Sequence, residues 1–347
     1  MSIGGHQGTT CDIITGDCLS LLRDLPTESV QCCVTSPPYW GLRDYGVDGQ
    51  IGAEASLEDF MARLVAVFRE VRRALKPDGV AWINMGDSYA GARGGGQGQS
   101  GQLSDRAAAT QGVGVKNRTT IVDGLKSKDL VGQPWALAFA LRADGWYLRQ
   151  DIIWAKPAPM PESVRDRCTK AHEYLFLLSK SQRYYWDAEA MKEPATFGGP
   201  NSPQSIKSPY GQGFTRVAKS GNKSRKPATE RGAPAEGVDG SVPWEGCTRN
   251  KRSVWTVSPE PFADAHFATF PSEIPRRCIL ASTRPGDVVL DPFGGSGTTG
   301  MVAVETGRSA ILYELNPAYA KMALARCRTT VGLPLESCAR SSQTTFA

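Results

Sequence analysis

Apolar positions along the chain follow two different spacings, and their alternation predicts a mainly parallel α/β sheet. Short runs rich in β-branched residues end in small or turn-forming residues, and stretches with helical spacing lie between them. The runs expected to form strands are 12–15, 30–35, 80–85, 150–154, 173–178, 288–290 and 310–313. Strands that alternate with helices are typical of a doubly wound sheet, so we predict an α/β fold with about seven strands.

The clearest helix is expected over residues 57–75. Its apolar side chains recur every three or four positions and form one stripe: Leu57, Phe60, Met61, Leu64, Val65, Phe68, Val71 and Leu75. Ser56 followed three residues later by Asp59 is typical of a capping box at a helix start. The Lys-Pro-Asp-Gly sequence at 76–79 is expected to end the helix.

Two stretches interrupt this alternation. Residues 91–128 are rich in Gly, Gln and Ser and are expected to form a long mobile loop. Residues 197–255 are rich in Gly, Ser, Pro and Lys and are expected to form an inserted module without a large core. The predicted division of the chain is therefore 1–196, then the insert 197–255, then 256–335, with a tail at 336–347.

Composition narrows the class of protein. Apolar residues make up 40% of the chain and charged residues 22%, and no run approaches the roughly 20 apolar residues of a membrane span. The N-terminus lacks the basic start and apolar run of a secretion signal, so a cytoplasmic location is expected. The nine cysteines include no C-x-x-C pair and the three histidines lie far apart, which predicts neither a metal site nor a disulfide framework.

Charge is concentrated in the predicted insert. Residues 201–252 hold ten basic side chains against four acidic ones, whereas the net charge of the whole chain is +5. The rest of the chain is thus close to neutral. Without further context a basic loop is as often a solvated surface as a nucleic-acid contact.

The C-terminal part contains a nucleoside-binding pattern. The strand at 288–290 leads into Asp-Pro-Phe-Gly-Gly-Ser-Gly-Thr-Thr-Gly at 291–300, and the strand at 310–313 ends in Glu314. Glycines let the backbone approach a ligand closely, and an acid after the second strand can accept hydrogen bonds from ribose hydroxyls. No Lys follows the glycines, which excludes a P-loop, but the turn alone suits a nicotinamide dinucleotide as well as S-adenosylmethionine.

A second pattern follows the strand at 30–35. Ser36-Pro37-Pro38-Tyr39 places a hydroxyl, two prolines and an aromatic ring at the end of this strand. Consecutive prolines have fixed φ and no N–H, so their carbonyls are held in a stiff acceptor surface. Such a surface suits an exocyclic amine of a nucleic-acid base, whose lone pair must be localised before it can attack a methyl group. If Ser36 and the Pro37 carbonyl each accept one N–H, the lone pair turns toward the donor, and Tyr39 can stack on the base.

The two patterns together resemble the DNA amino-methyltransferases, which make N4-methylcytosine or N6-methyladenine. Because the SPPY segment precedes the cofactor segment, the order resembles the β class of these enzymes. The resemblance extends to residues 75–79, 83–89, 151–157, 172–180 and 266–271, and so covers most of the chain outside 91–128 and much of the insert. It implies a Rossmann-like methyltransferase fold and S-adenosylmethionine as the cofactor.

The resemblance also implies roles for individual residues. The catalytic positions are Ser36, Pro37, Pro38 and Tyr39. The cofactor positions are Asp291, Pro292, Phe293, Gly295, Gly297, Thr298 and Glu314, with Thr269 and Phe270 near the methionine end and Asp17 near the adenine as further candidates. The insert corresponds to the target-recognition region, and phosphate contacts are expected from Lys223, Arg225, Lys226, Arg249, Lys251 and Arg252.

The partner implied is double-stranded DNA, with the target base flipped into the active site. A second copy of the chain and a cognate restriction endonuclease are partners that the sequence leaves open. Ser at the first SPPY position favours N4-cytosine as the target, with N6-adenine as the alternative. A non-catalytic nucleic-acid-binding protein and an NAD-dependent dehydrogenase are the competing functions. Ring-carbon methylation is set aside because no Cys follows a Pro.

Other conspicuous residues have simpler interpretations. Trp40, Cys32 and Cys33 are expected to pack in the core, and His172 is expected to be structural because no second metal ligand lies near it in sequence.

Overall fold

The structure is a computed structural model, and it describes residues 2–4, 8–41, 47–90, 124–194, 248–260 and 270–330. The predicted loop at 91–128 lies mostly outside these residues, as do Thr269, Lys223, Arg225 and Lys226. The predictions made for them remain predictions.

One sheet organises the main part of the chain. In spatial order its strands are β1 (Ser2–Gly4), β2 (Thr10–Thr15), β11 (Ser309–Glu314), β10 (Val288–Asp291), β3 (Val30–Thr35), β4 (Leu75–Met85), β6 (His172–Ser179), β5 (Tyr147–Ala155) and β9 (Val254–Thr256). Neighbours pair in parallel except at β1 and on both sides of β6. The predicted α/β class and all seven predicted strands are confirmed. The short edge strands β1 and β9 were not predicted.

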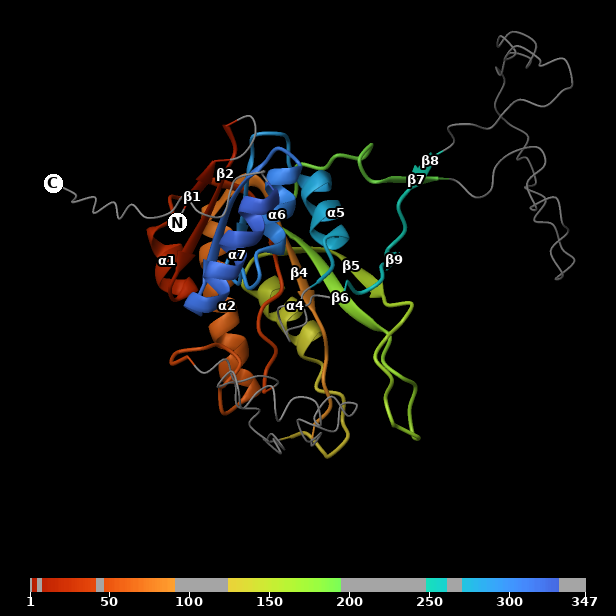
Figure 1. Cartoon of the computed structure of the whole chain (residues 1–347). Helices are drawn as coiled ribbons and strands as arrows, with labels where there is room; N and C mark the ends of the chain where they lie inside the picture. Colours follow the sequence, from red (N-terminus) through yellow and green to blue (C-terminus); the bar gives the residue numbers. More distant parts are fainter. Residues whose placement is uncertain are drawn as a thin grey trace, which may run out of the picture. The chain divides into compact units, whose positions relative to one another are not determined.

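Helices cover both faces of this sheet (Figure 1). They are α1 (Cys18–Asp24), α2 (Leu57–Ala74), α4 (Gln133–Ala143), α5 (Glu273–Ser282), α6 (Thr298–Glu305) and α7 (Pro317–Thr330). Two neighbouring residues of β3 show the division, because successive side chains of a strand point to opposite faces. Cys32 lies 3.2 Å from Ser282 of α5, whereas Cys33 packs in the cluster under α2 and α4. Both cysteines are fully buried, as predicted.

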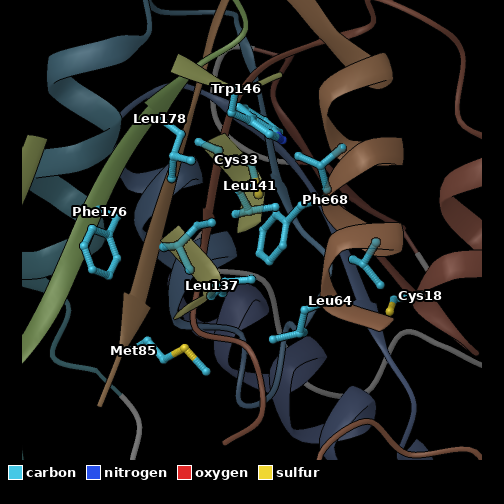
Figure 2. Packing of buried hydrophobic residues seen from close by; sticks show 14 of the residues in the cluster. Cys18, Cys33, Leu64, Phe68, Met85, Leu137, Leu141, Trp146, Phe176 and Leu178 are labelled. Carbon is cyan, nitrogen blue, oxygen red and sulfur yellow. The ribbon is translucent and has the colours of Figure 1, made fainter. Parts of the chain in front are cut away.

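The predicted amphipathic helix forms the main wall of the core. Ser56 accepts a hydrogen bond from the Asp59 amide at 3.0 Å, which caps α2 as expected. Figure 2 shows Leu64 and Phe68 of α2 facing Leu137 and Leu141 of α4 beside the sheet. Each of the four side chains is at most 1% exposed. Burial of such side chains stabilises a fold by roughly 1.5–3 kcal/mol each, so this layer fixes the helices to the sheet.

The end of α2 differs in detail from the prediction. The helix stops at Ala74, and β4 begins at Leu75 rather than at residue 80. The Lys-Pro-Asp-Gly sequence lies inside this longer strand, where the pairing with β3 shifts register between Val30 and Cys32. The proline and glycine that end the helix therefore make an irregular stretch of strand instead of a loop.

The chain divides into two compact units, one of residues 1–190 and 252–347 and one of residues 191–251. In the smaller unit, β7 (Lys192–Pro194) pairs antiparallel with β8 (Thr248–Asn250). Trp255 was expected to belong to the insert, but it lies in β9, which pairs with β5, and is 2% exposed. Among the described helices, none is long and apolar enough to cross a membrane.

Candidate active site

The predicted chemistry collects at one edge of the sheet. Strands β2, β11, β10, β3, β4 and β5 run in the same direction and end at this edge, where the reversed strand β6 begins. In open α/β sheets, ligands bind at the carboxyl ends of the strands. The SPPY turn follows β3 and the glycine turn follows β10, and these two strands are neighbours. Segments that are more than 250 residues apart in the chain therefore meet at one place.

Asp291 joins the two turns. Its carboxylate accepts hydrogen bonds from the hydroxyls of Thr35 at 2.6 Å and Thr299 at 2.7 Å, and from the Phe293 amide at 3.0 Å. The residue is 1% exposed. The Asp291 carboxylate therefore fixes the ends of β3 and β10 to each other, and its expected contact with the cofactor stays a prediction.

Burial raises the pKa of the Asp291 carboxyl from 3.8 to about 6, although the bonds from Thr35, Thr299 and Phe293 oppose the rise. The folded protein then binds this proton more tightly than the unfolded chain. The bound proton therefore adds up to about 3 kcal/mol to the free energy of unfolding below pH 4, and this stabilisation is lost as the pH rises through 6. Urea unfolding of the wild-type protein and of Asp291→Asn between pH 4 and 7 tests this. The wild type should lose stability relative to the variant as pH rises, and the opposite trend would contradict the assignment.

The glycine turn and Glu314 lie in direct contact, as a cofactor cradle would require. Gly295 has φ +51° and a built Cβ there would meet nothing closer than 3.9 Å, so the backbone surface is open to a ligand. The Gly295 amide donates to one oxygen of Glu314 at 2.8 Å, and the Asn316 amide donates to the other at 2.8 Å. Two amides thus orient a half-buried carboxylate at the end of β11, as an acceptor of two ribose hydroxyls requires. Burial raises the pKa of Glu314 above its ordinary value, and the two amides oppose that rise. These residues fit the nucleoside part of S-adenosylmethionine.

Arg326 supports this turn and was not predicted. From α7 its guanidinium donates to the Ser296 carbonyl and hydroxyl, both at 2.7 Å, and to the Thr298 hydroxyl at 3.0 Å. Thr298 is buried and its hydroxyl accepts this bond, and its expected contact with the cofactor stays a prediction. The sequence does hold a signal for Arg326: it lies on the side of α7 that also holds the buried residues Ala323 and Cys327, where a charged side chain needs partners within the protein.

The SPPY turn lies beside the glycine turn with its side chains partly covered. Ser36, Pro38 and Tyr39 are half-buried and Pro37 is buried. The Tyr39 hydroxyl donates to Glu173 of β6 at 2.8 Å.

Trp40 packs in the core as predicted, with 5% exposure. Its backbone N–H donates to the buried amide of Gln133 at 3.2 Å, which links the SPPY turn to the start of α4.

The other candidate residues lie in several places. Asp17 is exposed and caps α1 by accepting from the Ser20 amide at 2.8 Å, and the preceding Gly16 amide donates to the Glu314 carbonyl at 3.0 Å. Asp17 therefore follows a residue bonded to the end of β11, and its expected contact with the adenine stays a prediction. Phe270 is half-buried just before α5.

The basic candidates that the structure describes are Arg249, Lys251 and Arg252. Arg249 pairs with Glu193 at 2.9 Å across β7 and β8, so its charge is already compensated within the smaller unit. Among the described residues, no group of three His, Cys, Asp or Glu could hold a metal ion.

A model of the N6/N4 DNA methylase family matches residues 30–325, which include both turns. The chain belongs to this family. The Type II methyltransferase M.Cfr9I of Citrobacter freundii is 46% identical to this methylase, over 90% of the present chain and 86% of its own. The Type II methyltransferase M.SmaI of Serratia marcescens is 44% identical over 91% and 90% of the two chains.

Solved structures show the same fold. The PvuII DNA methyltransferase, a cytosine-N4-specific enzyme, aligns with a TM-score of 0.57 at 19% identity, covering 90% of the present chain and 85% of its own. The Thermus thermophilus protein TTHA0409, solved in complex with S-adenosyl-L-methionine, aligns with a TM-score of 0.55 at 24% identity over 92% and 94% of the two chains.

Family membership decides the question that the glycine turn left open. This methylase is a DNA methyltransferase of the N6/N4 class, and S-adenosylmethionine is the methyl donor of the family. The predicted resemblance and the predicted cofactor are confirmed, and the dehydrogenase alternative is not supported.

Proposed function

We propose that this methylase transfers a methyl group to the N4 amine of cytosine in double-stranded DNA. One observation supports the site of the reaction above all others. The bond between Thr35 and Asp291 holds the ends of β3 and β10 together, so the SPPY turn and the cofactor turn face the same edge of the sheet. An acceptor surface for an amine is thereby next to a cradle for the methyl donor.

The SPPY residues would orient the target amine. Ser36 and the Pro37 carbonyl each accept one N–H, which localises the nitrogen lone pair for attack. The Tyr39 ring stacks on the flipped base and holds it in place. No strong base is needed, because a methylated amino nitrogen that carries a positive charge loses its proton readily. Catalysis by these residues is positioning together with electrostatic stabilisation.

The C-terminal residues would hold the donor. S-adenosylmethionine, when bound, supplies an electrophilic methyl group. Glu314 would accept the ribose hydroxyls, and the backbone at Gly295 and Phe293 would line the cofactor site. From the resemblance, Asp17 would contact the adenine side of the cofactor, and Thr269 and Phe270 the methionine side.

On the DNA side, we propose that the insert recognises the target and contacts phosphates through its basic residues, Lys223, Arg225, Lys226, Lys251 and Arg252. Because the similar proteins are Type II methyltransferases, a restriction endonuclease that cuts the same site is the expected partner in the cell.

The choice of cytosine rests on the family resemblance, in which Ser at the first SPPY position accompanies N4-cytosine methylation more often. The amines themselves do not distinguish the bases, because those of cytosine and adenine both offer two N–H donors. The test is to methylate unmodified DNA with the purified protein, digest it to nucleosides and identify the product by mass spectrometry. N4-methylcytosine is expected. N6-methyladenine would overturn the base assignment and leave the mechanism intact, whereas 5-methylcytosine would refute the mechanism. DNA treated with Ser36→Ala is the control for background modification.

A further inference from the structure

A pair of opposite charges lies directly behind the SPPY turn, and the mechanism above does not use it. Glu173 is the second residue of β6, and in the sheet it pairs with Trp154 near the end of β5. Its carboxylate accepts the Tyr39 hydroxyl on one oxygen at 2.8 Å and the Lys156 ammonium on the other at 2.5 Å. Both oxygens of Glu173 are therefore engaged, one by the catalytic turn and one by a cation.

Burial strengthens these two bonds, because it shields them from water. The side chains of Glu173 and Lys156 are only 14% and 22% exposed. Burial, followed by the Glu173 charge, raises the pKa of Tyr39 above its ordinary value. The phenol consequently stays protonated and donates to the carboxylate. A hydrogen bond to a charged acceptor that is shielded from water is worth more than one between neutral groups.

The backbone is shaped for this contact. Gly86 follows β4, and a Cβ built on it would lie 3.0 Å from the Tyr39 ring and 3.4 Å from the Glu173 carboxyl carbon. Because residue 86 has no side chain, the ring can lie against the strand end and reach Glu173. Lys156 is itself held in place, with its ammonium 4.4 Å from the centre of the Trp154 ring.

We propose that Glu173 is a positioning residue for methyl transfer, which holds the hydroxyl of Tyr39 so that the ring is preset to receive the target base. Lys156 donates to the other oxygen of Glu173 and so fixes the orientation of this carboxylate. The inference rests on the proposed function, because it assumes that Tyr39 contacts the base. It predicts that Glu173 acts through the Tyr39 hydroxyl and not merely through the stability of the fold.

A double-mutant cycle tests this prediction. Glu173→Ala, Tyr39→Phe and the double variant are compared with the wild type by the single-turnover rate of methyl transfer, with S-adenosylmethionine and DNA both saturating. Tyr39→Phe is expected to lower the rate roughly tenfold, the value of one hydrogen bond to a charged group. Adding Glu173→Ala to Tyr39→Phe should then lower the rate little further. Losses that multiply in the double variant would overturn the proposal.

A third variant, Glu173→Gln, is the conservative replacement: its amide oxygen can still accept from Tyr39, so it should lose less rate than Glu173→Ala. Asp144→Ala is the matched control, because Asp144 also accepts from a basic side chain, that of Arg69. Asp144 lies at the C-terminal end of α4, whereas the SPPY turn contacts the start of this helix. The control variant should keep the wild-type rate. The proposed role would be refuted if Glu173→Ala had the melting temperature of the wild type and also its rate of methyl transfer.

Affinity for S-adenosylmethionine should be the same in all of these variants. If the wild-type chain itself transfers no methyl group to DNA, the proposed function fails. If it does and the cycle shows no coupling, only the role of Glu173 fails.

Discussion

Ser36→Ala is expected to lower the rate of methyl transfer by at least about a hundredfold while leaving the affinity for S-adenosylmethionine close to that of the wild type. Loss of one preorganised group that stabilises a transition state typically costs a factor of this size. Ser36 is on the SPPY turn, whereas the cofactor cradle is built from the ends of β10 and β11. Single-turnover methylation and isothermal titration measure the two effects separately.

Glu314→Ala is the complementary variant. It removes the acceptor that the Gly295 and Asn316 amides orient, so it should weaken cofactor binding roughly tenfold or more. At saturating S-adenosylmethionine its rate should recover toward the wild-type value, while that of Ser36→Ala should not. Equal losses of cofactor affinity in the two variants would contradict the division between catalytic and cofactor residues.

Gly297→Ala is expected to destabilise the protein by about 2–4 kcal/mol. Gly297 has φ +80°, and a Cβ there would lie 2.7 Å from the Cβ of Ala323 and 2.9 Å from its Cα. The obstacle includes the backbone of α7, which cannot move aside without disturbing the glycine turn. Urea or thermal unfolding measures the loss.

Gly307→Ala is the matched control for that variant. Gly307 has nearly the same backbone conformation, φ +77°, but nothing lies within 4 Å of a Cβ built there. It should lose only the roughly 1–2 kcal/mol that a left-handed conformation costs an alanine. If both variants are equally destabilised, backbone conformation rather than contact with α7 explains the glycine at 297.

The sequence predicted the central strands well because a buried parallel strand is a continuous apolar run. It missed β1 and β9, since three-residue strands such as Val254–Thr256 have too few positions to show a pattern. It also placed Trp255 in the insert, because the composition around it is that of a loop. Trp255 forms a strand because it pairs with β5, which lies about a hundred residues earlier in the chain, and such distant pairing produces no pattern in the local sequence.

The site was predicted in part for the same reason. The SPPY and glycine turns are contiguous, so their residues could be identified together. Arg326 and Glu173 act across the fold, on Ser296 and on Tyr39, and neither belongs to a contiguous motif with its partner. The sequence also assigned Asp291 to the cofactor, although three donors from within the protein satisfy its carboxylate.

The order of strands in the sheet has a consequence for the synthesis of this chain. Strands β11 and β10, from the C-terminal part, insert between β2 and β3, which are made first. During synthesis, β2 and β3 therefore lack the strands that finally lie between them. Each has one unpaired edge until the residues up to 314 have left the ribosome. Contacts between such distant segments are slow to form, and unpaired edges favour aggregation. Chaperones that shield strand edges should accordingly raise the yield of folded methylase, and a chain released early should be degraded rather than partly active.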